Sequence, residues 1–222
     1  MATASSTAAP SGGRGRPRLV PARRRGETAR EEILDAAAEL FTRHGYTGTS
    51  TRMIAEAVGI RQASLYHYFG TKDDILATLL NTTVIAPLEY ARGLLDADGP
   101  ALSRLLELAR FDVDQLARSR WNLGALYLLP ELGDHRFAEF RSARAELADI
   151  YASLAARALG DDADKRSLLP FRLVESVIMM RADEQRGDLG DHTAAGLVDT
   201  IVGALAMLIE HRPEASSTPA AR

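Results

Sequence analysis

Apolar residues recur three or four positions apart along most of this chain, which is the spacing of one face of a helix. The first such run contains Ile33, Ala37, Leu40 and Phe41, and it stops at Gly45. A glycine directly after the last periodic residue is typical of a helix C-terminus. The pattern predicts a first amphipathic helix that ends just before this glycine.

Two shorter helices are expected next. Thr49 or Ser50 can cap a helix over 51–58, because a side-chain hydroxyl satisfies a free N–H group of the first turn. A tight turn at Gly59 then leads into a short helix over 62–68. Two helices joined by a short glycine-containing turn have the spacing of a helix-turn-helix motif.

Longer helices are predicted for the rest of the chain. A fourth helix starts near Thr71, whose hydroxyl can cap it, and it contains Pro87. Because proline lacks an N–H group, we expect this helix either to bend at Pro87 or to end there. Five further helical segments are predicted over 101–118, 121–129, 135–159, 167–186 and 192–211. No segment has a convincing strand pattern, so the predicted fold class is all-α.

Charge is distributed unevenly along the 222 residues. Residues 1–30 contain seven arginines against one glutamate, a net charge of +6, whereas the whole chain has a formal net charge of −3. Residues 1–26 and 213–222 are rich in small residues and proline without periodicity, so we expect both to be disordered. A basic arm on an acidic body indicates a polyanionic partner at one end only. A tail that merely aids solubility is the alternative.

Composition argues against several other classes of protein. The chain has no cysteine, and its five histidines are scattered without metal-ligand spacing. No glycine-rich phosphate loop is present. We therefore expect no enzymatic activity, no metal and no cofactor. No apolar run is long enough to cross a bilayer and the first residues lack the core of a signal peptide, so a cytoplasmic protein without a membrane partner is expected.

The short helix over 62–68 has the side chains that a DNA groove requires. In a helix-turn-helix the second helix enters the major groove. Gln62, Ala63 and Ser64 are short or polar and let the backbone approach, and glutamine can pair with adenine while alanine can contact a thymine methyl. Tyr66 and His67 are long enough to reach phosphates on either side.

Residues outside this helix complete the hypothesis. Leu65 and Phe69 are expected to face inward and hold the short helix to a three-helix core. Lys72 can place its ammonium and nearby backbone N–H groups on a phosphate. Arg14 and Arg16 flank a glycine and can lie in a narrow A·T-rich minor groove, although an arginine-rich tail can contain this pattern by coincidence.

Several motifs in order resemble the DNA-binding domain of TetR-type transcriptional regulators. They are ILDAA at 33–37, LFTRHGY at 40–46, TRMIAEAVGI at 51–60 and LYHYF at 65–69. The resemblance implies a homodimeric repressor whose C-terminal body binds a small molecule and then releases operator DNA. One departure is Arg61, which stands where the family often has a serine cap and which adds a possible phosphate or guanine contact.

The expected organisation is an N-terminal helix-turn-helix domain followed by a larger helical domain for ligand binding and dimerisation. The ranges are a basic arm over 1–26, the DNA-binding domain over 27–72, the ligand-binding and dimerisation domain over 73–212 and a flexible tail over 213–222. The residues predicted to bind DNA are Arg14, Arg16, Ser50, Thr51, Arg52, Arg61, Gln62, Ala63, Ser64, Tyr66, His67 and Lys72.

A ligand site is expected in the body, where polar residues interrupt apolar helical faces. Asp112, Arg144 and Glu175 could orient a hydroxylated aromatic compound or a small acid inside an aromatic cavity. The alternative is that Asp112 pairs with Arg144, that Glu175 pairs across a dimer, and that Trp121 and Tyr127 are core residues. The residues predicted to bind ligand are Asp112, Trp121, Asn122, Tyr127, Arg141, Arg144, Tyr151, Glu175 and Met179.

The last two helical segments are expected to form the dimer. Segments 167–186 and 192–211 are apolar on nearly all sides, and such helices must be covered, either by a second copy or within one chain. The predicted partners are therefore double-stranded operator DNA, a small-molecule inducer and a second copy of the chain. An activator of the same fold and a helical protein-interaction module are the alternative functions.

Overall fold

The computed structural model describes residues 25–187 and 193–211, and every regular element in these ranges is helical, which confirms the predicted all-α class. Within these ranges the α-helices are α1 (Ala29–His44), α2 (Thr51–Val58), α3 (Gln62–Leu65), α4 (Lys72–Leu95), α5 (Ala101–Arg118), α6 (Ala138–Leu159), α7 (Leu169–Arg186) and α8 (Ala194–Glu210). The 3₁₀ turns between the described helices are η1 (Leu123–Leu128), η2 (Pro130–Gly133), η3 (His135–Phe137) and η4 (Lys165–Leu168).

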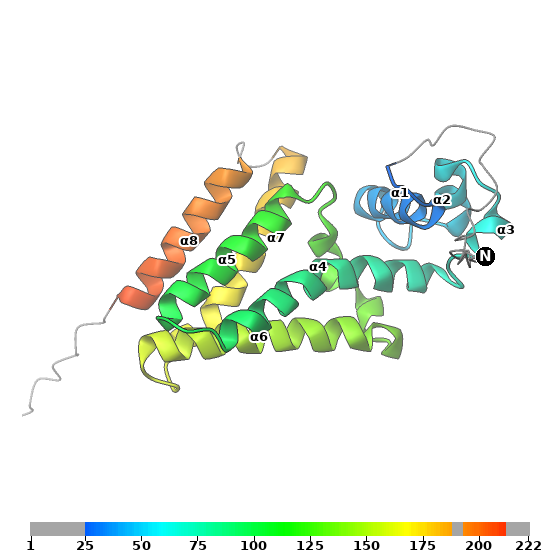
Figure 1. Cartoon of the computed structure of the whole chain (residues 1–222). Coiled ribbons are helices and arrows are strands. Elements are labelled where there is room, and N and C mark those ends of the chain that lie inside the picture. Colours follow the sequence, from blue (N-terminus) through cyan, green and yellow to red (C-terminus); the bar gives the residue numbers. More distant parts are fainter. Residues whose placement is uncertain (1–24, 188–192, 212–222) are drawn as a thin grey trace, which may run out of the picture.

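Helices α1 to α3 and the first turns of α4 form a head, and the remaining described elements form a larger body (Figure 1). Thr28 caps α1 through a reciprocal bond pattern with Glu31. Of the two expected caps for α2, Ser50 is the one used, since its hydroxyl accepts from the Met53 N–H. Thr49 is instead buried and donates to carbonyls at the end of α1.

The second helix of the helix-turn-helix, α3, is shorter than the predicted range 62–68. Only Gln62–Leu65 is α-helical, and the chain then tightens, with the Tyr68 N–H donating to the Leu65 carbonyl three residues back. Leu65 and Phe69 are both buried, which confirms their inward orientation. This tightening turns Tyr66, His67 and Tyr68 outward.

Helix α4 neither ends nor breaks at Pro87 but runs through it for 24 residues, from the head into the body (Figure 1). Pro87 has no N–H for the Thr83 carbonyl, one turn earlier. The Gln115 side chain of α5 replaces that donor, with Nε2 3.1 Å from the Thr83 oxygen. A side chain from the body therefore satisfies the carbonyl that proline leaves free.

Two expected helices begin differently in the structure. The segment expected as a helix over 121–129 is the 3₁₀ turn η1, preceded by residues without helical bonds. The segment expected over 135–159 starts with η3 and becomes α-helical only at Ala138. Short apolar runs rich in leucine fit either helix type, so their spacing alone did not separate them.

Among the described residues, buried apolar side chains form two clusters, and one of them joins head to body. The head cluster contains Ile33, Phe41 and Leu65, and it continues into Leu126 and Phe140 of the body. The other cluster lies among α4 to α8. The predicted boundary between 72 and 73 falls at the start of α4, which both parts share, and it stays a prediction. No helix in the described ranges has the length and apolar character to span a membrane.

Candidate nucleic-acid interface and ligand cavity

The outer face of the head carries a hydrogen-bonded trio of side chains from α2 and α3. Thr51 Oγ1 lies 2.9 Å from Gln62 Nε2 and 3.1 Å from the Tyr66 hydroxyl. Gln62 and Tyr66 are exposed and Thr51 is half-buried. The trio therefore orders two of the expected DNA-contacting side chains, those of Gln62 and Tyr66, before any partner is present.

The other expected DNA-contacting residues of the helix-turn-helix surround this trio. Arg61, Ala63 and His67 are exposed, and Ser64 is half-buried. Arg61 stands at the N-cap of α3 without a side-chain capping bond, as expected from its departure from serine. Arg52 is exposed and pairs with Glu56 one turn along, at 2.8 Å. Expected residues Arg14 and Arg16 lie outside the described residues.

Lys72 makes contacts inside the head that the sequence did not predict. Its ammonium donates to the carbonyls of Tyr46 and Thr49, at 2.8 and 2.9 Å, and lies 4.0 Å from the centre of the Tyr46 ring. This cation bonds two carbonyls of the α1–α2 turn, of which that of Tyr46 also accepts from the Thr49 N–H, so it fixes the head internally. An ammonium has three N–H donors and these contacts use two, so the expected contact of Lys72 with a phosphate stays a prediction.

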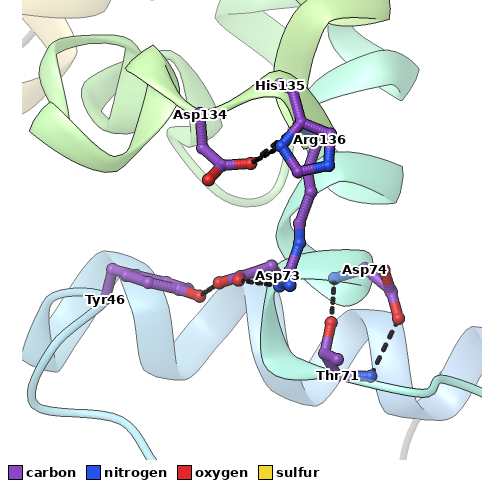
Figure 2. Close-up of polar contacts among 7 residues, drawn as sticks. All are labelled: Tyr46, Thr71, Asp73, Asp74, Asp134, His135 and Arg136. Atoms are coloured by element: carbon purple, nitrogen blue, oxygen red, sulfur yellow. Dashed lines mark hydrogen bonds and ion pairs between the residues drawn. The ribbon is translucent and has the colours of Figure 1, made fainter.

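A carboxylate at the start of α4 joins the head to the body (Figure 2). Asp73 accepts from the Tyr46 hydroxyl through one oxygen and from Arg136 through the other, at 2.5 Å in the latter case. Burial, with the bond to Asp73 as the next cause, raises the pKa of Tyr46 well above its ordinary value. Nothing in the local sequence pattern indicated Arg136 as the partner of Asp73. We call Tyr46, Asp73 and Arg136 the latch.

A second connection joins the body to α1. Asp35 Oδ1 accepts from Trp121 Nε1 at 3.0 Å and from Arg120 at 2.8 Å. Trp121 was expected to bind ligand, and its indole N–H is committed to the head instead. Trp121 and Asn122 also line a cavity of about 220 Å³ between α4, α5 and η1.

The largest group of expected ligand residues meets at a half-open cavity of about 410 Å³ beside α6. Tyr127, Phe140 and Phe171 supply aromatic walls, and Arg141 and Arg144 supply charge. The Arg144 guanidinium lies 5.4 Å from the centre of the Tyr127 ring and 5.3 Å from that of Phe171, within the range of a cation–π contact. We call this space the α6 cavity.

Arg144 is held by Glu175 in a two-bond pair, at 2.8 and 2.6 Å. Glu175 also pairs with Arg172 at 2.9 Å. The expected alternative of an Asp112–Arg144 pair is therefore wrong. The alternative in which Glu175 pairs across a dimer stays a prediction, and Glu175 already has two arginine partners within its own chain. Arg141 donates to the carbonyls of Leu132 and Asp134, so this cavity residue also anchors the loop before η3.

Asp112 is buried in the body core, away from the lining of the α6 cavity. Its only polar partner recorded in the described part of the chain is the Tyr151 hydroxyl, at 3.2 Å. Burial raises the Asp112 pKa from its ordinary value to about 7, partly offset by the Tyr151 bond. Burial also raises the Tyr151 pKa well above its ordinary range. Both residues were expected to bind ligand, and their contacts place them in the core.

Two other expected ligand residues have contacts that need no ligand. Asn122 is buried and its amide donates to the Ile178 carbonyl at 2.9 Å. Met179 is 54% exposed on α7 and lines neither the α6 cavity nor the cavity beside Trp121. Helical spacing could not show which side of α7 faces inward, because apolar residues occupy most of its sides.

An apolar groove of about 590 Å³ lies on the exposed side of α7 and α8. Leu169, Leu173 and Met207 line it beside the small residue Ala204. Met207 is 68% exposed and Leu169 44% exposed. Large apolar side chains grouped in this way mark an interaction surface.

No cluster of histidine, aspartate and glutamate within residues 25–187 and 193–211 could hold a metal ion. The surface that stands out is the exposed α2–α3 pair of the head, which defines a helix-turn-helix protein. Residues 33–79 match the family described as bacterial regulatory proteins, tetR family.

Known proteins agree with this class. The fold is similar to that of AmtR from Mycobacterium smegmatis, with a TM-score of 0.76 and 54% identity over 87% of this chain and 92% of the other. The chain is 34% identical to the transcriptional repressor KstR2 of Mycobacterium tuberculosis over 37% of its own length and 42% of the relative. It is 37% identical to the transcriptional repressor AcnR of Corynebacterium glutamicum over 23% of its own length and 27% of the relative. These matches span less than half of the two curated repressors, whereas the AmtR match spans nearly the whole fold. The chain belongs to the TetR family.

Proposed function

We propose that this chain is a transcriptional repressor that binds palindromic operator DNA as a homodimer and is released by a small-molecule inducer. The observation that carries the proposal is the hydrogen-bonded Thr51–Gln62–Tyr66 trio. It lies on the exposed face of a helix-turn-helix whose inward residues, such as Leu65 and Phe69, are buried. The names of the similar KstR2 and AcnR proteins, both transcriptional repressors, support repression rather than activation.

DNA binding places α3 in the major groove with its first residues toward the base edges. Ala63 is small and exposed, so it lets the helix approach closely. Arg61 and His67 stand at the two ends of α3, within reach of the flanking phosphates. In this proposal Arg14 and Arg16 add a contact in the neighbouring minor groove.

The apolar groove on α7 and α8 is proposed as the surface that meets a second copy. A twofold axis brings the same groove of each copy together, and small residues such as Ala204 let the helices approach. A twofold dimer also presents two recognition helices to the two halves of a palindrome.

The α6 cavity is proposed as the inducer site. Its aromatic walls suit a ring, and its arginines suit a carboxylate or a phenolic hydroxyl. Because Arg144 is already paired with Glu175, a ligand carboxylate would have to compete for this guanidinium. A hydroxylated aromatic compound or a small aromatic acid fits both conditions.

The loop between Leu132 and Arg136 provides a route from this cavity to the head. Arg141 lines the cavity and donates to the Leu132 and Asp134 carbonyls, and Arg136 on the same loop bonds to Asp73 of the latch. A ligand that draws Arg141 away would free the loop and weaken the latch. It can shift the head only by its difference in affinity for the two states.

The proposal is tested by gel shift with the promoter DNA that flanks the coding sequence, with and without compounds chosen by thermal shift. A retarded complex that a stabilising compound dissolves supports the proposal, because a ligand that binds the folded state raises its melting temperature. Absence of a specific complex, against an unrelated duplex of equal length, refutes it.

A further inference from the structure

The Thr51–Gln62–Tyr66 trio leaves defined hydrogen-bonding groups facing outward. Gln62 Nε2 donates to Thr51 Oγ1 at 2.9 Å, and Thr51 Oγ1 lies 3.1 Å from the Tyr66 oxygen. An amide nitrogen is a donor only, so the direction of the first bond is fixed. The Gln62 Oε1 atom has no bond within the described part of the chain.

The hydroxyl of Thr51 is not used inside its own helix. Threonines inside the helices, such as Thr42 and Thr78, donate their hydroxyls to the carbonyl one turn back. Thr51 is the first residue of α2 and makes no such bond. Either hydroxyl of the Thr51–Tyr66 pair can be the donor. When Thr51 donates to the Tyr66 oxygen, Thr51 Oγ1 acts on Gln62 as an acceptor only, and the Tyr66 proton is left for a partner outside the protein.

We propose that Thr51 is a positioning residue that fixes the Gln62 amide to recognise adenine, an inference that rests on the proposed DNA-binding function. The held amide presents its oxygen as an acceptor and its second N–H as a donor. Adenine offers the complementary pair in the major groove, an N6 donor beside the N7 acceptor. Guanine offers two acceptors there, so its O6 atom would meet the amide oxygen. The Tyr66 proton is directed to a neighbouring phosphate oxygen.

Without the Thr51 hydroxyl the amide can rotate by half a turn, which exchanges its oxygen and nitrogen. The freed amide can also tilt so that its NH2 group alone faces the guanine N7 and O6 acceptors with its oxygen turned away, and guanine is then tolerated. Thr51 thus determines specificity without contacting a base. The substitution Thr51→Val keeps the shape of the side chain and removes the hydroxyl, whereas Thr51→Ser keeps the hydroxyl.

The test starts from a randomised duplex library from which the full-length protein enriches its preferred sequence. The position that Gln62→Ala no longer selects identifies the contacted base pair. Fluorescence anisotropy then compares duplexes with each of the four base pairs at that position, for the native protein, Thr51→Val and Thr51→Ser. Thr78→Val, on α4 and outside the α2–α3 pair, is the matched control.

The native protein, Thr51→Ser and Thr78→Val are expected to prefer adenine over guanine by about 5- to 150-fold, the range of one good base contact. Thr51→Val is expected to bind the adenine duplex but to lose most of that preference. A base other than adenine at the Gln62 position, or an unchanged preference in Thr51→Val, overturns the inference. Failure of the native protein to enrich any sequence overturns the proposed DNA-binding function instead.

Discussion

The buried carboxyl of Asp112 makes the stability of this protein depend on pH in a predictable direction. Its pKa in the folded chain is about 7, against an ordinary value of 3.8, because burial disfavours the charged form. Between these values the folded chain binds a proton that the unfolded chain has lost. Stability from this group is therefore complete below pH 3.8 and declines as pH rises toward 7.

Replacing Asp112 with asparagine removes the charge and keeps a carbonyl acceptor for the Tyr151 hydroxyl. The pKa difference is about 3 units, and at about 1.4 kcal/mol per unit the charged form costs at most about 4 kcal/mol at pH 8. We expect Asp112→Asn to be similar to the native protein near pH 4.5 and more stable than it near pH 8. Because the asparagine NH2 group would lack a clear acceptor at this buried site, the gain is expected to be about 1–4 kcal/mol.

Urea unfolding at several pH values between 4.5 and 8 measures this difference. Asp98→Asn, in an exposed loop, serves as the control and is expected to show no pH-dependent gap. Tyr151→Phe removes the one hydrogen bond to the carboxylate and is expected to cost more at pH 8 than at pH 4.5. A gap between Asp112→Asn and the native protein that stays constant with pH would refute the reasoning.

Three further predictions concern the head, the latch and the α6 cavity. Lys72→Met removes two hydrogen bonds to carbonyls and a cation–π contact. It is therefore expected to lower the free energy of unfolding by about 1–3 kcal/mol, measured by urea denaturation. An unchanged unfolding midpoint would contradict the internal role of this lysine. Arg136→Ala frees Asp73, and it is expected to change operator affinity measured by anisotropy, whereas no change in affinity would show that the latch does not set the head. Arg144→Ala is expected to abolish the response to inducer in a gel shift while DNA binding persists, and an inducer that still works on this variant would mean that the site lies elsewhere; such a variant leaves Glu175 with Arg172 as its partner.

Local sequence patterns were enough to predict the head, because caps, turns and inward residues there follow one another within a few positions. The Ser50 cap, the turn at Gly59 and the burial of Leu65 and Phe69 all depend on neighbours close in sequence. The recognition helix was predicted too long since the tightening after Leu65 depends on how Phe69 packs.

Partners distant in sequence could not be predicted from the pattern. The Asp73–Arg136 bond joins residues 63 positions apart. The Gln115 side chain of α5 donates to the Thr83 carbonyl of α4, which lacks the N–H group of Pro87 as its partner. A charged residue on an apolar helical face can either line a cavity, as Arg144 does, or be buried in the core, as Asp112 is. The sequence pattern is the same in both cases. That distinction needed the packing of α5 against α6.

The central claim, that two copies place α3 in successive major-groove segments of one duplex, is tested most directly by site-specific cross-linking. The chain has no cysteine, so Ala63→Cys provides one exposed attachment point on α3 for a photoactivated cross-linker. With the enriched duplex, cross-links are expected at two sites separated by about 10 base pairs, one helical turn, or a multiple of it. Cross-links that are absent, or no stronger than those from an exposed control cysteine at Asp98, would contradict the account.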